Sequence, residues 1–228
     1  MSRHLSGIFL SLFLFLFSSL ANAGIIIGGT RVIYISDHAD ETISIINKDE
    51  AFPYLIQAWV DPFDSNDKSK PPFTVIPPVS RLDPLQEKVL RIMKTKGALP
   101  EDRESVFWLN IKNIPPASNR KTPNTLEIAI KTRIKLFWRP ASLNVTPESV
   151  ALKMKWRVDN HQLIVENPSP IHINIMDVAV DGKDIPLNII RPFETLRLPL
   201  PTNVVGHNVI WHFVDDRGAI SQDIKIKL

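Results

Sequence analysis

Short apolar runs recur along the chain, and no segment carries the sustained 3.6-residue period of an amphipathic helix. Most runs are rich in Val, Ile, Thr or aromatic residues, and many are bounded by Pro, Asp, Asn or Ser. In the first part of the chain they fall at residues 31–35, 41–46, 54–60, 73–76, 88–92, 105–111 and 126–138. Many short strands at such spacing predict an all-β sandwich or barrel.

A second series of apolar runs begins after Arg139-Pro140. Its members fall at 152–158, 162–166, 171–180, 195–198, 208–213 and 220–228. The polar, proline-flanked stretch 141–147 separates the two series. We therefore predict two domains, residues 24–143 and 144–228, each close to the roughly 100 residues of an immunoglobulin-like sandwich.

The first residues have the pattern of a secretory signal peptide. Arg3 and His4 precede an apolar run at 8–17, and Ala21-Asn22-Ala23 supplies a cleavage site. We predict that residues 1–23 are removed after export. A retained membrane anchor is the alternative, but the run is shorter than the roughly 20 apolar residues that span a bilayer.

Composition narrows the classes of function. The chain contains no cysteine, which excludes thiol catalysis and Cys-based zinc sites. Its net charge is +3, and the basic residues are scattered among acidic ones, which argues against a nucleic-acid surface. No Gly-x-Ser-x-Gly elbow and no compact pair of metal-binding histidines is present, so we expect neither an enzyme nor a metal or other cofactor.

Four segments, taken in order, resemble one protein family. They are 29–34, then 55–60 with 77–82, then 99–116, and finally 126–130 with 134–140. Together they resemble the periplasmic pilus or fimbrial chaperones of the PapD-like family. The likeness covers nearly the whole first domain, and is less distinct in the second, where 164–168 and 216–218 carry it.

The resemblance implies two immunoglobulin-like sandwiches set at an angle, with a cleft between them. It also implies a function: binding pilus subunits that lack a final strand, lending them a strand, and delivering them to an outer-membrane usher. Strand addition at a sheet edge gives affinity through main-chain hydrogen bonds. The free protein could also self-associate. An exported immunoglobulin-like adhesin or ligand-binding module is the alternative function.

Arg31 and Lys135 match the two cleft cations that bind the subunit's C-terminal carboxylate in this family. Arg presents a planar fork to a carboxylate, and Lys adds a mobile point charge. The residues alone favour solvated or ion-paired surface cations, because strand-borne Lys and Arg are usually exposed, and it is the surrounding motifs that favour the anchor.

Leu126, Ile128 and Ile130 alternate with polar or small residues, so they share one face of a strand. The pattern by itself favours the core of their own domain, but it does not decide between core and surface. The resemblance instead implies that they project outward and fill the subunit's groove. A shift of one residue would present Glu127 and Lys131 in their place, which is why a fixed anchor is needed.

Glu104, Arg139 and Asp216 match an ion-pair network that joins the two domains in the family. Three separate exposed charges, each contributing little, are the alternative. The short polar segment 113–124 resembles the short-loop branch of the family, whereas the long-loop branch usually carries a cysteine pair that is absent here.

Overall fold

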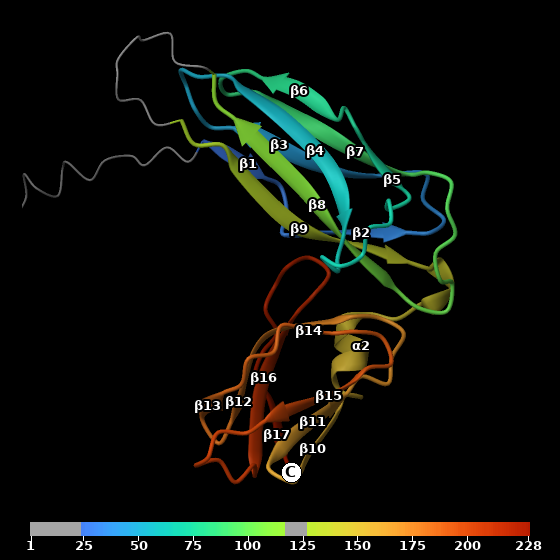
Figure 1. Ribbon diagram of the computed structural model, residues 1–228, viewed down its shortest axis with the longest axis vertical. Coiled ribbons are helices and arrows are strands. Elements are labelled where there is room, and N and C mark those ends of the chain that lie inside the picture. The colour runs from blue at the N-terminus through green and yellow to red at the C-terminus, as the bar shows by residue number, and fades with distance from the viewer. Residues whose placement is uncertain (1–23, 117–126) are drawn as a thin grey trace, which may run out of the picture.

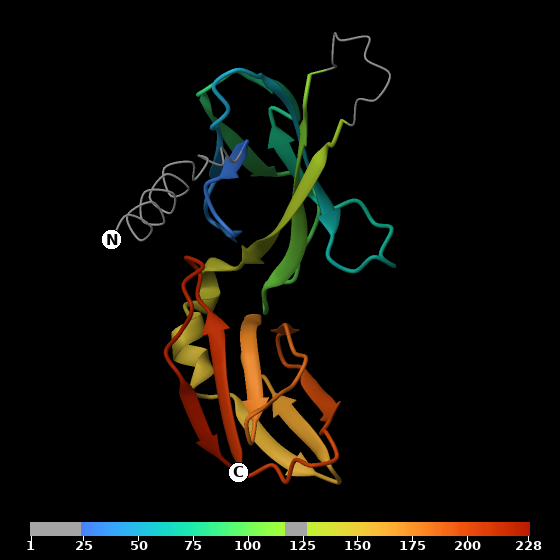
Figure 2. The same ribbon diagram turned by 90° about the vertical axis from the view of Figure 1, so that its left-hand side faces the viewer.

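The computed structural model describes residues 24–116 and 127–228, and almost all of its regular structure is strand. Two lobes lie end to end, and the strands of one run obliquely to those of the other (Figure 1). The view turned by 90° shows the same arrangement, with the chain crossing once between the lobes (Figure 2). The predicted all-β fold class is confirmed.

The first lobe is a sandwich of two sheets. One sheet has the strand order β1-β3-β7-β5, and the other has the order β2-β9-β8-β4-β6. The strands are β1 (Ile25–Ile27), β2 (Arg31–Ile35), β3 (Glu41–Asn47), β4 (Tyr54–Pro62), β5 (Phe73–Ile76), β6 (Val79–Leu82), β7 (Glu87–Lys94), β8 (Ser105–Ile114) and β9 (Ile130–Arg139).

The second lobe pairs the sheet β10-β11-β15 with the sheet β13-β12-β16-β17, in which β14 also pairs with β12. A 3₁₀ turn, η1 (Ala141–Leu143), and a short helix, α2 (Pro147–Ala151), precede it. The strands are β10 (Lys155–Asp159), β11 (Gln162–Glu166), β12 (Ile173–Val180), β13 (Lys183–Asp184), β14 (Ile189–Ile190), β15 (Thr195–Pro199), β16 (Asn208–Val214) and β17 (Ile224–Lys227).

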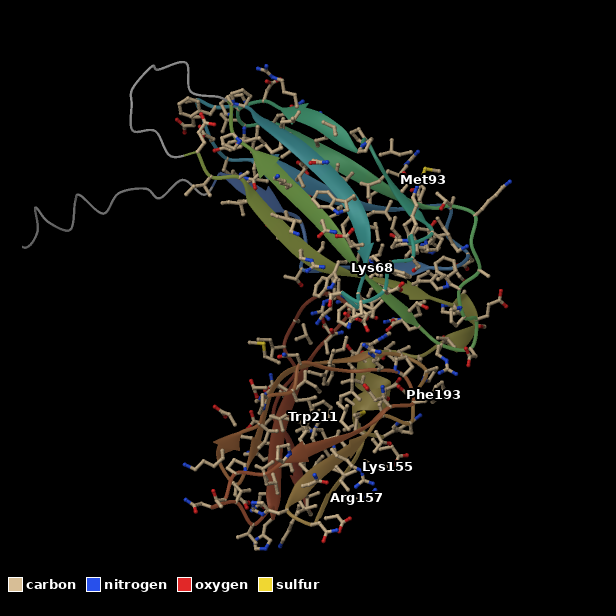
Figure 3. All side chains as sticks on the ribbon, viewed as in Figure 1. Lys68, Met93, Lys155, Arg157, Phe193 and Trp211 are labelled. Carbon is tan, nitrogen blue, oxygen red and sulfur yellow. The ribbon has the colours of Figure 1, made fainter. Side chains whose placement is uncertain are left out.

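Each lobe encloses its own apolar core. In β9 the alternating residues Ile134, Leu136 and Trp138 pack into the first core, so Lys135 projects from the opposite face. In the second lobe Trp211 is fully buried, and Figure 3 shows it among the strands. Lys155 and Arg157, which are separated by one residue of β10, project outward in the same figure. Side-chain alternation thus determines which face of each strand meets solvent.

The prediction of a strand at 152–158 is partly wrong, because helix α2 ends just before it and strand β10 begins only at Lys155. Thr146 and Ser149 form a capping box, and Pro147 occupies the first helical turn, where its missing N–H costs nothing. The predicted strand 171–180 contains a bulge between Ile175 and Asp177. The shortest strands, such as β1, were not predicted.

Three predictions fall wholly or mostly outside the described residues: the signal peptide at 1–23, the role of Leu126, and the short connection at 113–124.

The domain boundary at 143/144 stays a prediction. In the described ladders no strand of β1–β9 pairs with a strand of β10–β17. Across residues 24–116 and 127–228, no helix has both the length and the apolar character needed to cross a membrane.

Candidate functional site

Arg31 and Lys135 lie side by side on neighbouring strands. Strands β2 and β9 pair in parallel, and Arg31 is the direct ladder partner of Lys135. Because residues paired across a ladder point to the same face, both side chains leave the first lobe together, away from its core. The sequence alone did not indicate this pairing, since the two residues belong to segments far apart in the chain.

Both cations reach the second lobe. Arg31 Nη1 donates to the carbonyl oxygen of Val214 at 3.2 Å, and Lys135 Nζ donates to Asn174 Oδ1 at 2.7 Å. Neither cation forms an ion pair with a carboxylate among the described residues. Arg31 Nε is buried and has no hydrogen-bond partner in that part of the chain. The pair therefore has unused donors.

Burial shapes the electrostatics of the cation pair. Desolvation lowers the pKa of Arg31, although the charges of Asp216, Asp215 and Glu104 act in the opposite direction. Desolvation and then the charge of Arg31 lower the pKa of Lys135. Two like charges held together away from water are costly, and an anion placed between them would remove much of that cost.

Strand β9 has an open backbone edge next to these cations. Strand β8 pairs with β9 from Ile130 to Trp138, whereas β2 covers the other edge only from Lys135 to Arg139. In the described structure, residues 130–134 therefore have no ladder partner on the β2 side. Such an edge presents unpaired N–H and C=O groups to another strand.

The strand predicted at 126–138 is wrong at its start, because β9 begins only at Ile130, so Ile128 lies two residues before the open edge. Ile128 and Ile130 are exposed, by 62% and 56%. They line a cleft of about 570 Å³ between the start of β1 and the start of β9. Neither side chain is enclosed by the core of its own lobe, which the alternation pattern by itself had favoured. Exposed apolar side chains beside an open strand edge are typical of a protein-binding surface.

Glu104, Arg139 and Asp216 come together where the lobes meet. Arg139 Nε donates to Glu104 Oε1 at 2.8 Å, while Nη1 and Nη2 donate to the two oxygens of Asp216 at 2.6 and 2.8 Å. The Glu104 side chain is fully buried, and that of Asp216 is 32% exposed. Arg139 comes from the first lobe and Asp216 from the second, so the guanidinium joins them.

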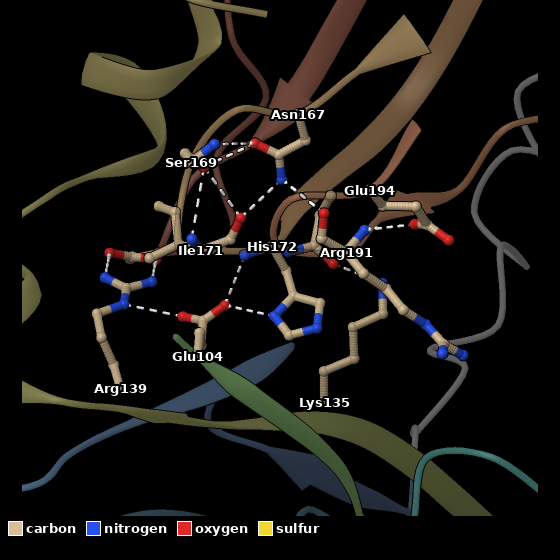
Figure 4. A network of polar contacts seen from close by, with 11 residues as sticks. Glu104, Lys135, Arg139, Asn167, Ser169, Ile171, His172, Arg191 and Glu194 are labelled. Carbon is tan, nitrogen blue, oxygen red and sulfur yellow. Dashed lines mark hydrogen bonds and ion pairs between the residues drawn. The ribbon is translucent and has the colours of Figure 1, made fainter. Parts of the chain in front are cut away.

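His172 adds a fourth member that the sequence did not indicate. Glu104 Oε2 accepts the backbone N–H of His172 at 2.9 Å and lies 2.7 Å from its Nδ1 (Figure 4). A side-chain network positions this histidine: Asn167 Nδ2 donates to the carbonyl oxygen of Ile171, and Ser169 Oγ donates to Asn167 Oδ1. Figure 4 also shows Lys135 reaching toward the second lobe beside His172.

The two carboxylates of this network stabilise the charged form of Arg139. Burial alone would lower the pKa of Arg139, but its hydrogen bonds and charge pairing with Asp216 and Glu104 outweigh burial and raise it.

The turn that carries Asp216 comes close to Thr30 of the first lobe at Gly218, whose φ is +89°. A Cβ there would lie 2.6 Å from Thr30 Oγ1, so only glycine fits the contact.

Two family models match the chain, and each covers one of the two lobes. Residues 24–144 match the family model described as "Pili and flagellar-assembly chaperone, PapD N-terminal domain", and residues 149–225 match "Pili assembly chaperone PapD, C-terminal domain". The chain belongs to the PapD-like family of pilus-assembly chaperones.

Similar proteins share most of the chain's length. Chaperone protein FimC of Escherichia coli K12 is 36% identical and covers 88% of this chain and 83% of its own. Chaperone protein caf1M of Yersinia pestis is 37% identical over 87% and 83%. A chain of the Salmonella enterica SafA pilin–SafB chaperone complex superimposes with a TM-score of 0.81 at 33% identity, covering 92% of this chain and 99% of that one.

Membership of the chaperone family decides between the functions left open by the sequence. The family consists of periplasmic assembly chaperones, which are not enzymes, so the protein is a non-enzymatic periplasmic chaperone and not an exported adhesin. Solved relatives have two immunoglobulin-like domains, in agreement with the two sandwiches. Among the described residues no group of three or more potential ligands could hold a metal ion.

Proposed function

We propose that this protein captures pilus subunits by strand addition along β9 and hands them to an outer-membrane usher. The observation that carries the proposal is the continuity of one strand. Its first half has an open edge that begins at the exposed Ile130, two residues after the exposed Ile128, and its second half carries Lys135 beside Arg31. Because both features belong to one strand, the distance between the open edge and the proposed anion-binding pair is fixed.

The subunit's C-terminal carboxylate is proposed to bind between Arg31 and Lys135. Each cation donates one hydrogen bond to the second lobe and retains further N–H donors. A carboxylate has two oxygens and offers an acceptor to each cation. Because every chain has a single C-terminal carboxylate, this contact would fix where the subunit's strand starts.

Ile128 and Ile130 are proposed to fill the subunit's groove, and Leu126 to continue the series. Ile130 lies five residues before Lys135, which in a strand is about 17 Å. A slip of one residue would bring Glu127 and Lys131 to the groove, so a fixed anchor discriminates strongly between registers. The apolar groove of a free subunit would otherwise aggregate.

Pilus subunits are the partners that the relatives support. Chaperone SafB was solved in complex with the pilin SafA, and chaperone CsuC with the tip subunit CsuE. The second likeness is at 14% identity and supports the fold alone. Delivery to an usher follows from the same family function.

The proposal is tested by co-expressing the protein with a pilus subunit encoded beside it and measuring recovered complex. Arg31→Ala and Lys135→Ala should each lower recovery about 10- to 100-fold, because a charge-assisted hydrogen bond contributes about 1.5–3 kcal/mol. Lys131→Ala is the matched control, since Lys131 is exposed on the same face of β9. Full recovery by both cleft variants, with folding verified by circular dichroism, would refute the carboxylate anchor.

A further inference from the structure

Two pairs of residues face each other across the junction of the lobes. Arg31 and Lys135 are ladder partners on β2 and β9, and Asn174 and Val214 are ladder partners on β12 and β16. Lys135 donates to Asn174, and Arg31 donates to Val214. The ends of two strands in the second lobe therefore hold both cations of the first lobe in place.

Both acceptors are electrically neutral. Val214 contributes a backbone carbonyl and Asn174 a side-chain amide oxygen, and Asn174 is only 6% exposed. A neutral oxygen orients an ammonium group without cancelling its charge. A carboxylate at the same position would compensate Lys135 internally and compete with an incoming anion.

The nearby carboxylates are engaged elsewhere. Asp216 and Glu104 pair with Arg139, and Asp215 accepts the backbone N–H groups of Arg217 and Ala219 within its own turn. They influence Arg31 only through space. In the described residues, the oxygens that touch the two cations are thus the neutral ones.

We infer that Asn174 is a positioning residue, which holds Lys135 from the second lobe and keeps the cleft cationic. This inference rests on the proposed function and deepens it: preference for a terminal carboxylate depends on an uncharged acceptor at position 174. The anion site then belongs to both lobes, because the first supplies the charges and the second fixes their direction.

The test compares Asn174→Asp with Asn174→Ala. The probe is a synthetic peptide of alternating apolar residues that ends in a free carboxylate, together with the same peptide as a C-terminal amide. Wild-type protein should bind the acid at least about 10-fold more tightly than the amide, equivalent to one charge-assisted contact. Asn174→Asp should abolish this preference, and Asn174→Ala should reduce it in part.

A second readout separates positioning from general stability. NMR titration of Lys135 should give a higher pKa in Asn174→Asp than in wild-type protein, because the new carboxylate favours the charged ammonium. Asn203→Asp is the charge-matched control, since Asn203 is exposed in the connection before β16, at the end of the strand away from Val214. This variant should keep the wild-type preference and the wild-type pKa of Lys135.

The possible failures are distinguishable. If wild-type protein binds acid and amide equally, the carboxylate anchor of the proposed function is wrong. If wild-type protein discriminates and Asn174→Asp discriminates equally well, only the role of Asn174 is overturned. Equal loss of acid and amide binding in both variants, in step with a lower Tm, would make Asn174 merely structural and would also overturn the inference.

Discussion

Ile130 and Ile134 project from the same face of strand β9, yet Ile130 is 56% exposed and Ile134 only 7%. The face continues without a break, but the opposing sheet covers only its second half. One strand therefore serves two purposes, since its later residues build the core of the first lobe and its earlier ones remain available to a partner.

This difference predicts that the same substitution has unequal effects on stability at the two positions. Ile134→Ala should lower the free energy of unfolding by about 2–5 kcal/mol, because it leaves a cavity in the core. Ile130→Ala should change it by no more than about 0.5 kcal/mol, as is usual at the surface. Urea unfolding measures both, and subunit co-purification should weaken for Ile130→Ala despite its normal stability.

Ile128→Asp extends the same comparison with a charge. Because Ile128 is 62% exposed, an aspartate there should leave Tm almost unchanged and yet sharply weaken subunit capture. The measurement pairs a thermal melt with co-purification. A large drop in Tm with unaltered capture would mean that Ile128 packs in its own domain.

Glu104 and Asp216 should contribute unequally to stability although both pair with Arg139. Glu104→Ala leaves Arg139 and His172 without their buried partner, and we expect a loss of about 3–5 kcal/mol. Asp216→Ala removes a partly exposed partner and should cost less. Denaturant midpoints of the two variants test the order. Equal losses would contradict the inference that the buried partner contributes more than the partly exposed one.

Gly218→Ala should loosen the contact between the lobes. The substitution strains a positive φ and places a methyl group against Thr30, so we expect a loss of about 1–3 kcal/mol. Adding Thr30→Gly removes the clash but leaves the backbone strain, and the double variant should recover only part of the stability. Complete recovery would show that the backbone strain is negligible.

His212 should make the second lobe sensitive to pH. Its Nδ1 lies 2.6 Å from Asp177 and its Nε2 lies 3.1 Å from Asp223, which also pairs with Lys225. Hydrogen bonds to Asp177 and Asp223 raise the pKa of His212. Because the pKa of His212 is higher in the folded than in the unfolded protein, the folded state is stabilised at pH values below the unfolded pKa of about 6.5. This stabilisation disappears as the pH rises through the pKa of the folded state.

The expected effect of pH on stability is modest because His212 is near the surface. Raising the pH from 5.5 to 8.5 should lower Tm by no more than about 2–4 °C through this cluster, the equivalent of up to roughly 1 kcal/mol. In His212→Gln that part of the pH dependence should vanish. An unchanged pH profile in His212→Gln would assign the dependence to other groups. At lower pH, Asp223 loses its own contribution to stability as it becomes protonated, since hydrogen bonding to His212 lowers its pKa in the folded state.

The sequence by itself determined the fold class, the approximate strands and the family, because alternation and turn residues are local and the family's motifs are continuous segments. It also placed Arg31, Lys135, Glu104, Arg139 and Asp216 at the site through resemblance. It did not show that β9 is covered along only half its length, since alternation assigns residues to a face but not to what lies opposite.

The tertiary structure alone supplied the partners from the second lobe, His172, Asn174 and Val214. These contacts join residues far apart in the chain, and no local pattern marks a backbone carbonyl or a single asparagine as a partner of a distant cation. Topology brings them together, because the parallel pairing of β2 with β9 places both cations opposite the ends of β12 and β16.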